Sequence, residues 1–216
     1  MKSADTKQKI LDKALALFLA QGYNPVSIGE IAKVVGIKAP FLYNHFQSKQ
    51  TTFDAIAEPT AAKYEADAEK IDIHVHNAQK NIPVFKEITE NALFEKVQQI
   101  FEYSLHNETI SQFRGMMTIE QFRSPEPAKL YIRRYVERVL DYHAEIFHAL
   151  MAAVEICSKD SDAPAMMYVA SVLALISVCD CQHEKESKYL KKLQKHVQFF
   201  FCMVHGGTSQ SGESHE

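Results

Sequence analysis

The stretch GIKAPFLYNHFQSK, residues 36–49, places three aromatic rings, one imidazole and two amines within fourteen residues. Core packing explains Leu42 and Phe46, but it does not explain the other polar and aromatic side chains. Phenol, imidazole and ammonium groups donate hydrogen bonds, and the two lysines also carry charge. Gathered near the N-terminus, these residue types favour a polyanion as the partner of this segment.

The charge of the chain is divided unevenly along its length. Seven lysines against three acidic residues give the first 50 residues a charge of +4, although the whole chain carries −3. The rest of the chain therefore carries −7. Because phosphate would repel an acidic body, we expect only the N-terminal end to meet a polyanion.

Length and composition indicate one large domain or two small ones. The chain has 216 residues, 46% of them hydrophobic, with seven glycines, seven prolines and long apolar runs at helical spacing, which favours an all-α protein. Glycine-rich dinucleotide, Walker and nucleophile-elbow motifs are absent, so we expect no enzyme. The cysteines, all between residues 157 and 202, do not resemble a secreted disulfide framework, and no charged-then-apolar leader precedes them, so we expect a cytoplasmic protein.

Short helices must position the polar and aromatic side chains of residues 36–49. Apolar spacing predicts a first helix over 6–21, and Ser27 with Glu30 has the spacing of a capping box at the start of a second. Gly36 is expected to end that second helix. Pro40 is tolerated only in a first turn, so a third helix begins there. Two short helices joined by a glycine turn make a helix-turn-helix.

The rest of the chain is predicted to be helical, apart from a loop over 71–82. Ser48 is expected to cap a fourth helix that Pro59 kinks without ending it. The apolar window 163–178 is shorter than the ~20 residues that cross a bilayer, so we expect a buried helix there and no membrane contact. The tail 206–216 is expected to be disordered. Further helices are predicted over 91–106, 111–122, about 132–154, 163–181 and 187–204.

The run KILDKALALFLAQGYNPVSIGEIAKVVGIKAPFLYNHFQSKQTTFDAI, residues 9–56, resembles the DNA-binding domain of the tetracycline-repressor (TetR) family of bacterial transcriptional regulators. The resemblance rests on several elements in order, from the phenylalanine and glycine that end the first helix to "LYNHF" and "SK". It implies a helix-turn-helix domain over 1–48, a larger helical effector-binding and dimerisation domain over 49–205, and the tail over 206–216.

The family resemblance also implies which residues meet DNA. Tyr43, His45 and Lys49 match positions that bond phosphate oxygens, and residues 27–29 match a helix start whose amides face a phosphate. Residues 38–41 match positions that meet base edges, with Phe41 and Gly29 departing from the family pattern. We therefore expect bases to be recognised by Lys38 and by apolar contact with thymine methyls, and we expect DNA shape to contribute more to selectivity. The implied DNA contacts are Ser27, Ile28, Gly29, Lys38, Ala39, Pro40, Phe41, Tyr43, His45 and Lys49.

The larger domain is implied to bind a small effector and to form a homodimer through its last two helices. Aromatic and methionine side chains on the middle helices suit an apolar or aromatic effector, with ordinary core packing as the alternative for each residue. The candidate effector contacts are Phe94, Phe101, Phe113, Met117, Phe122, Tyr135, His143, Phe147 and Met151. The candidate dimer contacts are Leu173, Ile176, Leu193, Val197, Phe200, Phe201 and Val204.

The resemblance implies a homodimeric, ligand-responsive repressor of a pseudo-palindromic DNA operator, without a cofactor. A transcriptional activator and a helical module that has lost DNA binding are alternatives. A metal- or thiol-responsive regulator is another, although Cys181 lies on a different helical face from Cys179 and His183, which leaves the loop histidines His74 and His76. An enzyme is a further alternative, using His143 with its acidic neighbours Glu137, Asp141 and Glu145.

Overall fold

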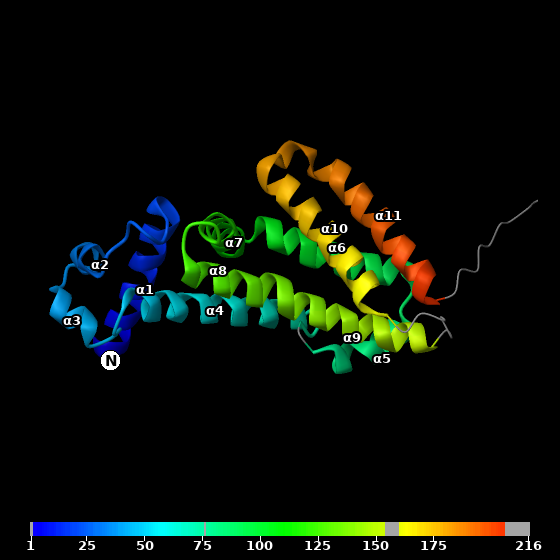
Figure 1. Ribbon diagram of the computed structural model, residues 1–216, viewed down its shortest axis with the longest axis horizontal. Helices are drawn as coiled ribbons and strands as arrows, with labels where there is room; N and C mark the ends of the chain where they lie inside the picture. Colours follow the sequence, from blue (N-terminus) through cyan, green and yellow to red (C-terminus); the bar gives the residue numbers. More distant parts are fainter. Residues whose placement is uncertain (1, 76, 154–159, 206–216) are drawn as a thin grey trace, which may run out of the picture. The chain divides into compact units, whose positions relative to one another are not determined.

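The computed structural model describes residues 2–75, 77–153 and 160–205, and these contain helices and no strand. The predicted all-α class is confirmed (Figure 1). The chain divides into two compact units, residues 1–67 with 106–136 (unit 1) and residues 68–105 with 137–216 (unit 2). Unit 1 contains α1 (Lys2–Gln21), α2 (Ile28–Val35), α3 (Ala39–Tyr43), most of α4 (Lys49–Glu69), α7 (Glu108–Glu120), α8 (Pro125–Tyr131) and most of η1 (Ile132–Glu137). Unit 2 contains α5 (Ala78–Glu87), α6 (Glu90–His106), α9 (Arg138–Ala153), α10 (Asp162–Cys181), η2 (His183–Lys185) and α11 (Glu186–His205).

Helix α1 forms because apolar residues recur every fourth position along one face. Ile10, Ala14 and Phe18 are completely buried on that face. The helix ends at Gly22, whose φ of +86° is left-handed and whose amide donates to the Phe18 carbonyl at 2.9 Å. Helix α1 begins four residues before the predicted start at residue 6, which is a common discrepancy at a helix terminus.

Helix α2 has the predicted cap at each end. The Ser27 hydroxyl accepts from the Glu30 amide at 3.1 Å, while the Glu30 carboxylate accepts from the Ser27 amide at 2.7 Å. Gly36 closes the helix at φ +84°, and its amide donates to the Ala32 carbonyl at 3.0 Å. The predicted capping box and the glycine stop are confirmed.

Helix α3 is only five residues long and ends at Tyr43. Pro40 lies in its first turn, as predicted. The amides of His45 and Phe46 both donate to the Leu42 carbonyl, at 2.9 and 3.0 Å, so these two residues form a turn that follows the helix. His45 therefore lies in this turn, two residues beyond the last residue of the helix.

The core of unit 1 joins the first four helices to α7. The Phe53 ring lies 5.6 Å from Phe18, 5.0 Å from Tyr23 and 6.1 Å from Phe113, measured between ring centroids. All four side chains are at most 5% exposed. The core of unit 1 thus extends past residue 48 into α4. The predicted boundary between a DNA-binding domain over 1–48 and an effector-binding domain over 49–205 stays a prediction.

Unit 2 includes a helix that the sequence analysis assigned to a loop. Helix α5 begins at Ala78, where the Asn77 side chain accepts from the Lys80 amide, and it contains Ile82, so the predicted loop over 71–82 is too long. The fully buried Asn81 side chain donates to the Tyr142 hydroxyl at 2.6 Å. This bond to α9 stabilises a polar helix whose own sequence gives a weak helical signal.

The long helix predicted over 132–154 is interrupted at its start. Residues 132–137 form the π-helical segment η1, and α9 follows it to Ala153, while Val154 lies outside the described residues. Within unit 1, Arg134 of η1 donates to the Ala57 carbonyl of α4 at 2.7 Å and lies 3.6 Å from the Glu58 carboxylate. Apolar spacing alone did not show this change of helical period.

Helices α10 and α11 lie side by side and run in opposite directions, connected by the short η2 (Figure 1). By length and composition α10 could cross a membrane, because the mean hydropathy of its most apolar window is 1.7. A core helix of a soluble protein can have the same length and composition. Only 22% of that window is buried, so the expectation of a buried helix is wrong for the single chain. The residues that this chain leaves exposed include Met166, Met167, Ala170, Ser171, Ala174 and Ser177.

Candidate nucleic-acid interface

Helix α3 and the residue before it leave a cation and two aromatic rings exposed to solvent. Phe41 is 58% exposed and Tyr43 is 53% exposed, and Lys38 at the helix start is also exposed. Leu42 between the two rings is completely buried. The buried leucine fixes the rotation of the helix, and because each residue turns it by about 100°, Phe41 and Tyr43 lie on the two flanks of the buried side, both open to solvent.

The start of α2 is also exposed. Ser27 and Gly29 are exposed, and Ile28 is half-buried. The Ser27 hydroxyl is already engaged in the capping box, and hydrogen bonds from the Ser27 amide and hydroxyl lower the pKa of the Glu30 carboxyl. A phosphate approaching this end of the helix would therefore be met by the following amides more readily than by the serine side chain.

The remaining residues implied to meet DNA differ in exposure. Pro40 is exposed, whereas Ala39 and His45 are half-buried. Phe46 is 4% exposed, and the Lys7 ammonium lies 5.6 Å from the centroid of its ring. Phe46 thus packs as predicted while its ring also receives a cation from α1.

Lys49 holds the protein together in this structure instead of reaching outward. Its ammonium donates to the carbonyls of Tyr23 at 3.0 Å and Asn24 at 3.2 Å, and it lies 4.2 Å from the centroid of the Tyr23 ring. Burial lowers the pKa of this amine, while the carboxylates of Glu126, Glu120 and Glu30 act in the opposite direction. The implied phosphate contact stays a prediction, and it would require the ammonium to leave these partners.

The residues predicted to contact an effector fall in different cores. Phe113, Met117 and Tyr135 pack in the core of unit 1. Within unit 2, Phe147 and Met151 belong to one cluster of buried side chains. Phe94 and Phe101 belong to another. Within the part of the chain that the structure describes, these residues therefore act as core side chains, and an effector contact stays a prediction for each of them.

Two of the predicted effector residues have distinctive surroundings. Phe122 is 85% exposed beyond the end of α7, which corrects the expectation that it faces a pocket. His143 of α9 bonds through Nδ1 to the Val139 carbonyl at 2.8 Å, and its ring lies between those of Tyr142 and Tyr168, at 4.9 and 5.1 Å between centroids. His143 is thus engaged in aromatic packing within unit 2.

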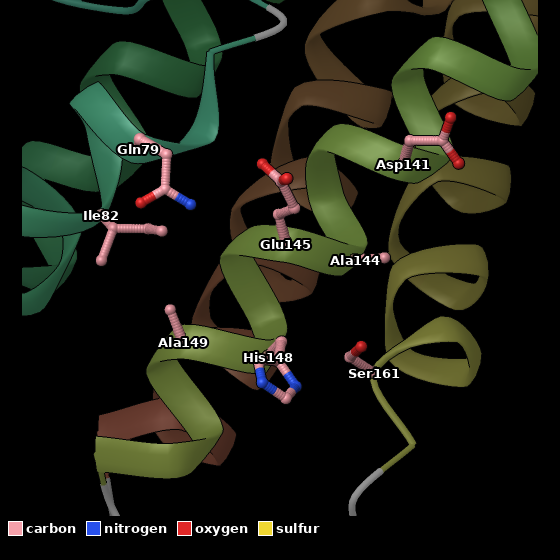
Figure 2. Close-up of a pocket in the computed structure, with 8 residues that line it drawn as sticks. All are labelled: Gln79, Ile82, Asp141, Ala144, Glu145, His148, Ala149 and Ser161. Carbon is pink, nitrogen blue, oxygen red and sulfur yellow. The ribbon is translucent and has the colours of Figure 1, made fainter.

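A cleft that the sequence analysis did not predict lies between α5 and α9 in unit 2 (Figure 2). Its volume is about 510 Å³. Its lining consists of Gln79, Ile82, Asp141, Ala144, Glu145, His148, Ala149 and Ser161. Figure 2 shows the Glu145 carboxylate projecting from α9 on the side that faces Gln79 and Ile82 of α5. Asp141, Glu145 and His148 follow each other at spacings of four and three, the only signal of this cleft in the sequence.

The predicted dimer contacts are divided between core and surface. Leu193, Val197, Phe200 and Val204 are at most 5% exposed within their own chain, so they are core residues and the prediction is wrong for them. Leu173, Ile176 and Phe201 are half-buried. The exposed uncharged residues are instead on α10, where methionine, alanine and serine recur at spacings of three and four.

The candidate metal ligands are not gathered in space. Cys179 is buried, whereas Cys181 and His183 are exposed. Among residues 2–75, 77–153 and 160–205, no three histidine, cysteine or acidic side chains form a group that could hold a metal ion. His74 lies 3.4 Å from the Glu69 carboxylate, and His76 falls outside the described residues.

Comparison with known proteins supports the assignment of the N-terminal helices. Residues 10–57 match the profile of the family described as "Bacterial regulatory proteins, tetR family". The chain is 44% identical over 57 residues to the transcriptional regulator AcrR of Shigella flexneri, which is 26% of each chain. It is 44% identical over 48 residues to IcaR, a negative regulator of the biofilm operon icaADBC in Staphylococcus aureus strain Newman, which is 22% of this chain and 26% of IcaR.

Solved structures resemble nearly the whole chain. The SmeT–triclosan complex aligns over 98% of both chains with a TM-score of 0.67 and 19% identity. The reduced form of Escherichia coli NemR aligns over 90% of this chain and 97% of its own, with a TM-score of 0.59 and 17% identity. The curated relatives are matched over about a quarter of their length, so sequence similarity is confined to the N-terminal helices. At these identities the structural likeness concerns the fold alone.

Proposed function

We propose that this chain, a member of the TetR family by its N-terminal domain and its fold, is a DNA-binding transcriptional regulator that acts as a homodimeric repressor in the cytoplasm. The observation that carries this proposal is the exposure of Lys38, Phe41 and Tyr43 on a short helix that Leu42 anchors in the core, together with the exposed, capped start of α2. Phosphate contacts fix such a surface on a duplex, and side chains at base edges select the sequence.

The chemistry of this surface suggests how DNA is read. Lys38 supplies a cation that can contact guanine or phosphate, and Tyr43 supplies a hydroxyl donor. The exposed Phe41 ring has no hydrogen-bonding group, so it suits the methyl group of thymine. We therefore expect an operator in which thymine methyls and DNA shape contribute to selectivity.

A homodimer is supported by the uncovered side of α10. Methionine, alanine and serine residues there form an uncharged strip that this chain does not bury, and small side chains allow close approach of a second helix. A second copy of the chain would cover this strip by two-fold symmetry. It would also supply a second α3, which matches a pseudo-palindromic operator.

A small effector would release the repressor from its operator by favouring a different arrangement of the dimer. The aromatic and methionine residues in unit 2, including Phe101, Phe147 and Met151, suit an apolar or aromatic molecule. The proposal that the protein represses agrees with the role of IcaR as a negative transcriptional regulator. The proposal of a ligand is compatible with the fold shared with SmeT, which was solved as a complex with triclosan.

The function can be tested with the DNA upstream of the protein's own gene. Mobility shifts of wild type should show salt-sensitive binding that prefers this DNA over an unrelated duplex of the same length. Tyr43→Ala should weaken the binding and Tyr43→Phe should show whether the hydroxyl carries the effect. Native mass spectrometry of the purified protein would give the mass of the dimer and of any retained effector. Binding without sequence preference would contradict the proposed function.

A further inference from the structure

Glu120, at the end of α7 in unit 1, is a carboxylate with almost no exposure to water. It is 2% exposed, and its oxygens lie near two groups of the following turn. The Arg123 guanidinium lies 3.7 Å from Oε1, and the Ser124 hydroxyl donates to Oε2 at 3.2 Å. Burying a charge costs free energy unless partners compensate it, so a carboxylate at this position needs a structural or functional reason.

The carboxylate lies against the residue that ends α1. A β-carbon added to Gly22 would lie 2.6 Å from Glu120 Oε1, closer than such atoms can approach. Gly22 also needs its left-handed φ of +86°, so two independent requirements exclude a side chain there. The glycine thus lets the carboxylate approach the backbone just before the turn between α1 and α2.

A hydrogen bond in the same place connects this turn to the corner between α7 and α8. The Asn24 side chain donates to the Arg123 carbonyl at 3.1 Å. Ser124 occupies the cap position of α8 but makes no side-chain cap bond, because its hydroxyl is directed to Glu120. The corner therefore holds the α1–α2 turn through Glu120 and Arg123.

The same turn is held from its other side by the start of α4. Lys49 donates to the carbonyls of Tyr23 and Asn24, and the Tyr23 hydroxyl donates to Gln50 at 2.8 Å. Helix α2 begins three residues after Asn24, at the Ser27 cap. A displacement of the turn would thus be passed directly to α2 and, through the Gly36 turn, to α3.

We propose that Glu120 is a positioning residue for DNA binding, which seats the α1–α2 turn on the α7–α8 corner and so fixes where α2 and α3 are presented. This inference rests on the proposed function, because the presented helices are those that meet DNA. Glu120 itself touches no DNA. A change in the position of α7 would alter the presentation of α3 through this contact.

The inference is tested with Glu120→Gln, which keeps the side-chain shape and removes the charge. Glu108→Gln, at the exposed start of the same helix, is the matched control. Asn24→Ala removes the second contact at an exposed position, so it should fold even where a change at the buried Glu120 does not. Amide hydrogen exchange over residues 22–27 and affinity for the upstream DNA are measured at a temperature where every variant is folded.

We expect Glu120→Gln to speed exchange over residues 22–27 and to weaken DNA binding, each about tenfold, which corresponds to about 1.4 kcal/mol. Asn24→Ala should weaken DNA binding about threefold, and Glu108→Gln should change neither quantity. Exchange in α5 and α11 of unit 2 should stay at the wild-type rate. Unchanged exchange and unchanged affinity in both Glu120→Gln and Asn24→Ala would overturn the inference while leaving the proposed function intact.

A double-mutant cycle provides a readout that does not involve DNA. Gly22→Ala should lower the melting temperature by at least about 3 °C more in wild type than in a Glu120→Ala background, where only the backbone strain remains. Equal shifts of the melting temperature in both backgrounds would show that Glu120 does not pack against Gly22, which would overturn the inference. A wild-type protein that binds no upstream DNA would instead overturn the proposed function, and with it the role of Glu120 in DNA binding.

Discussion

The Lys49 ammonium lies 3.0 Å from the Tyr23 carbonyl oxygen and 4.2 Å from the centroid of the Tyr23 ring. One lysine thus makes a charge-assisted hydrogen bond and a cation–π contact with the same residue. The contact joins the first residue of α4 to the turn between α1 and α2. It makes Lys49 a structural part of the domain that presents α3.

The main effect of removing this contact should be a loss of protein stability. We expect Lys49→Met to lower the free energy of unfolding by about 1–3 kcal/mol, because two carbonyls lose a charged donor. Urea unfolding at neutral pH measures this, with the exposed Lys63→Met on the same helix as control. A stable Lys49→Met variant whose DNA binding loses about one unit of salt dependence would show that Lys49 contacts phosphate after all.

The capping box of α2 should also be measurable. Ser27→Ala removes the hydroxyl that accepts from the Glu30 amide, and we expect a loss of about 1 kcal/mol in the free energy of unfolding. Ser27→Thr should restore most of it, because a threonine hydroxyl can also accept from the Glu30 amide and donate to the Glu30 carboxylate. Equal stability of wild type and Ser27→Ala would show that the cap contributes nothing measurable.

The local features of the DNA-binding helices could be predicted because their interactions lie close together in sequence. Ser27 and Glu30 are three residues apart, and Gly36 ends the helix that they begin. The role of Lys49 could not be predicted, since its partners are backbone carbonyls about 25 residues away that leave no mark in the sequence. The sequence pattern therefore predicts the cap at Ser27, but it does not predict the bonds from Lys49 to the turn between α1 and α2.

Long-range packing explains the other differences. Helix α5 depends on the bond between Asn81 and Tyr142, 61 residues apart, and the π-helical segment holds α4 through Arg134 and Ala57, 77 residues apart. For α11, apolar spacing showed that Leu193 and Val197 are covered, but not whether their own chain or a partner covers them. The structure shows that their own chain does.

The proposed dimer can be disrupted without disturbing the core of the subunit. Ala174 is exposed on the uncharged side of α10, so Ala174→Glu should leave the subunit folded and place a charge in the proposed interface. We expect this variant to be monomeric by sedimentation or native mass spectrometry. Lys192→Glu, on the exposed side of α11, is the control and should remain dimeric. A wild type that is already monomeric would contradict the proposed assembly.

Stability at high pH should depend on Tyr135. Burial raises the pKa of this phenol from 10.0 to about 12, although Arg134 and Arg114 act in the opposite direction. The folded state therefore holds the proton more tightly, so this contribution to stability is complete below pH 10 and is lost as the pH rises toward 12. Between pH 8.5 and 11, urea unfolding of Tyr135→Phe should show a loss smaller by about 1.4 kcal/mol than that of wild type. Equal losses in the two proteins would contradict the burial of this hydroxyl.

The most direct test of the whole account is the affinity for upstream DNA measured by fluorescence anisotropy over a range of salt concentrations. Wild type should bind this DNA more tightly than an unrelated duplex, Tyr43→Ala should weaken binding about tenfold, and Lys38→Ala should reduce the slope of log affinity against log salt by about 0.9 if it contacts phosphate. The exposed Lys13→Ala on α1 should leave affinity and slope unchanged. If Tyr43→Ala and Lys38→Ala both bind as wild type does, α3 is not the surface that meets DNA.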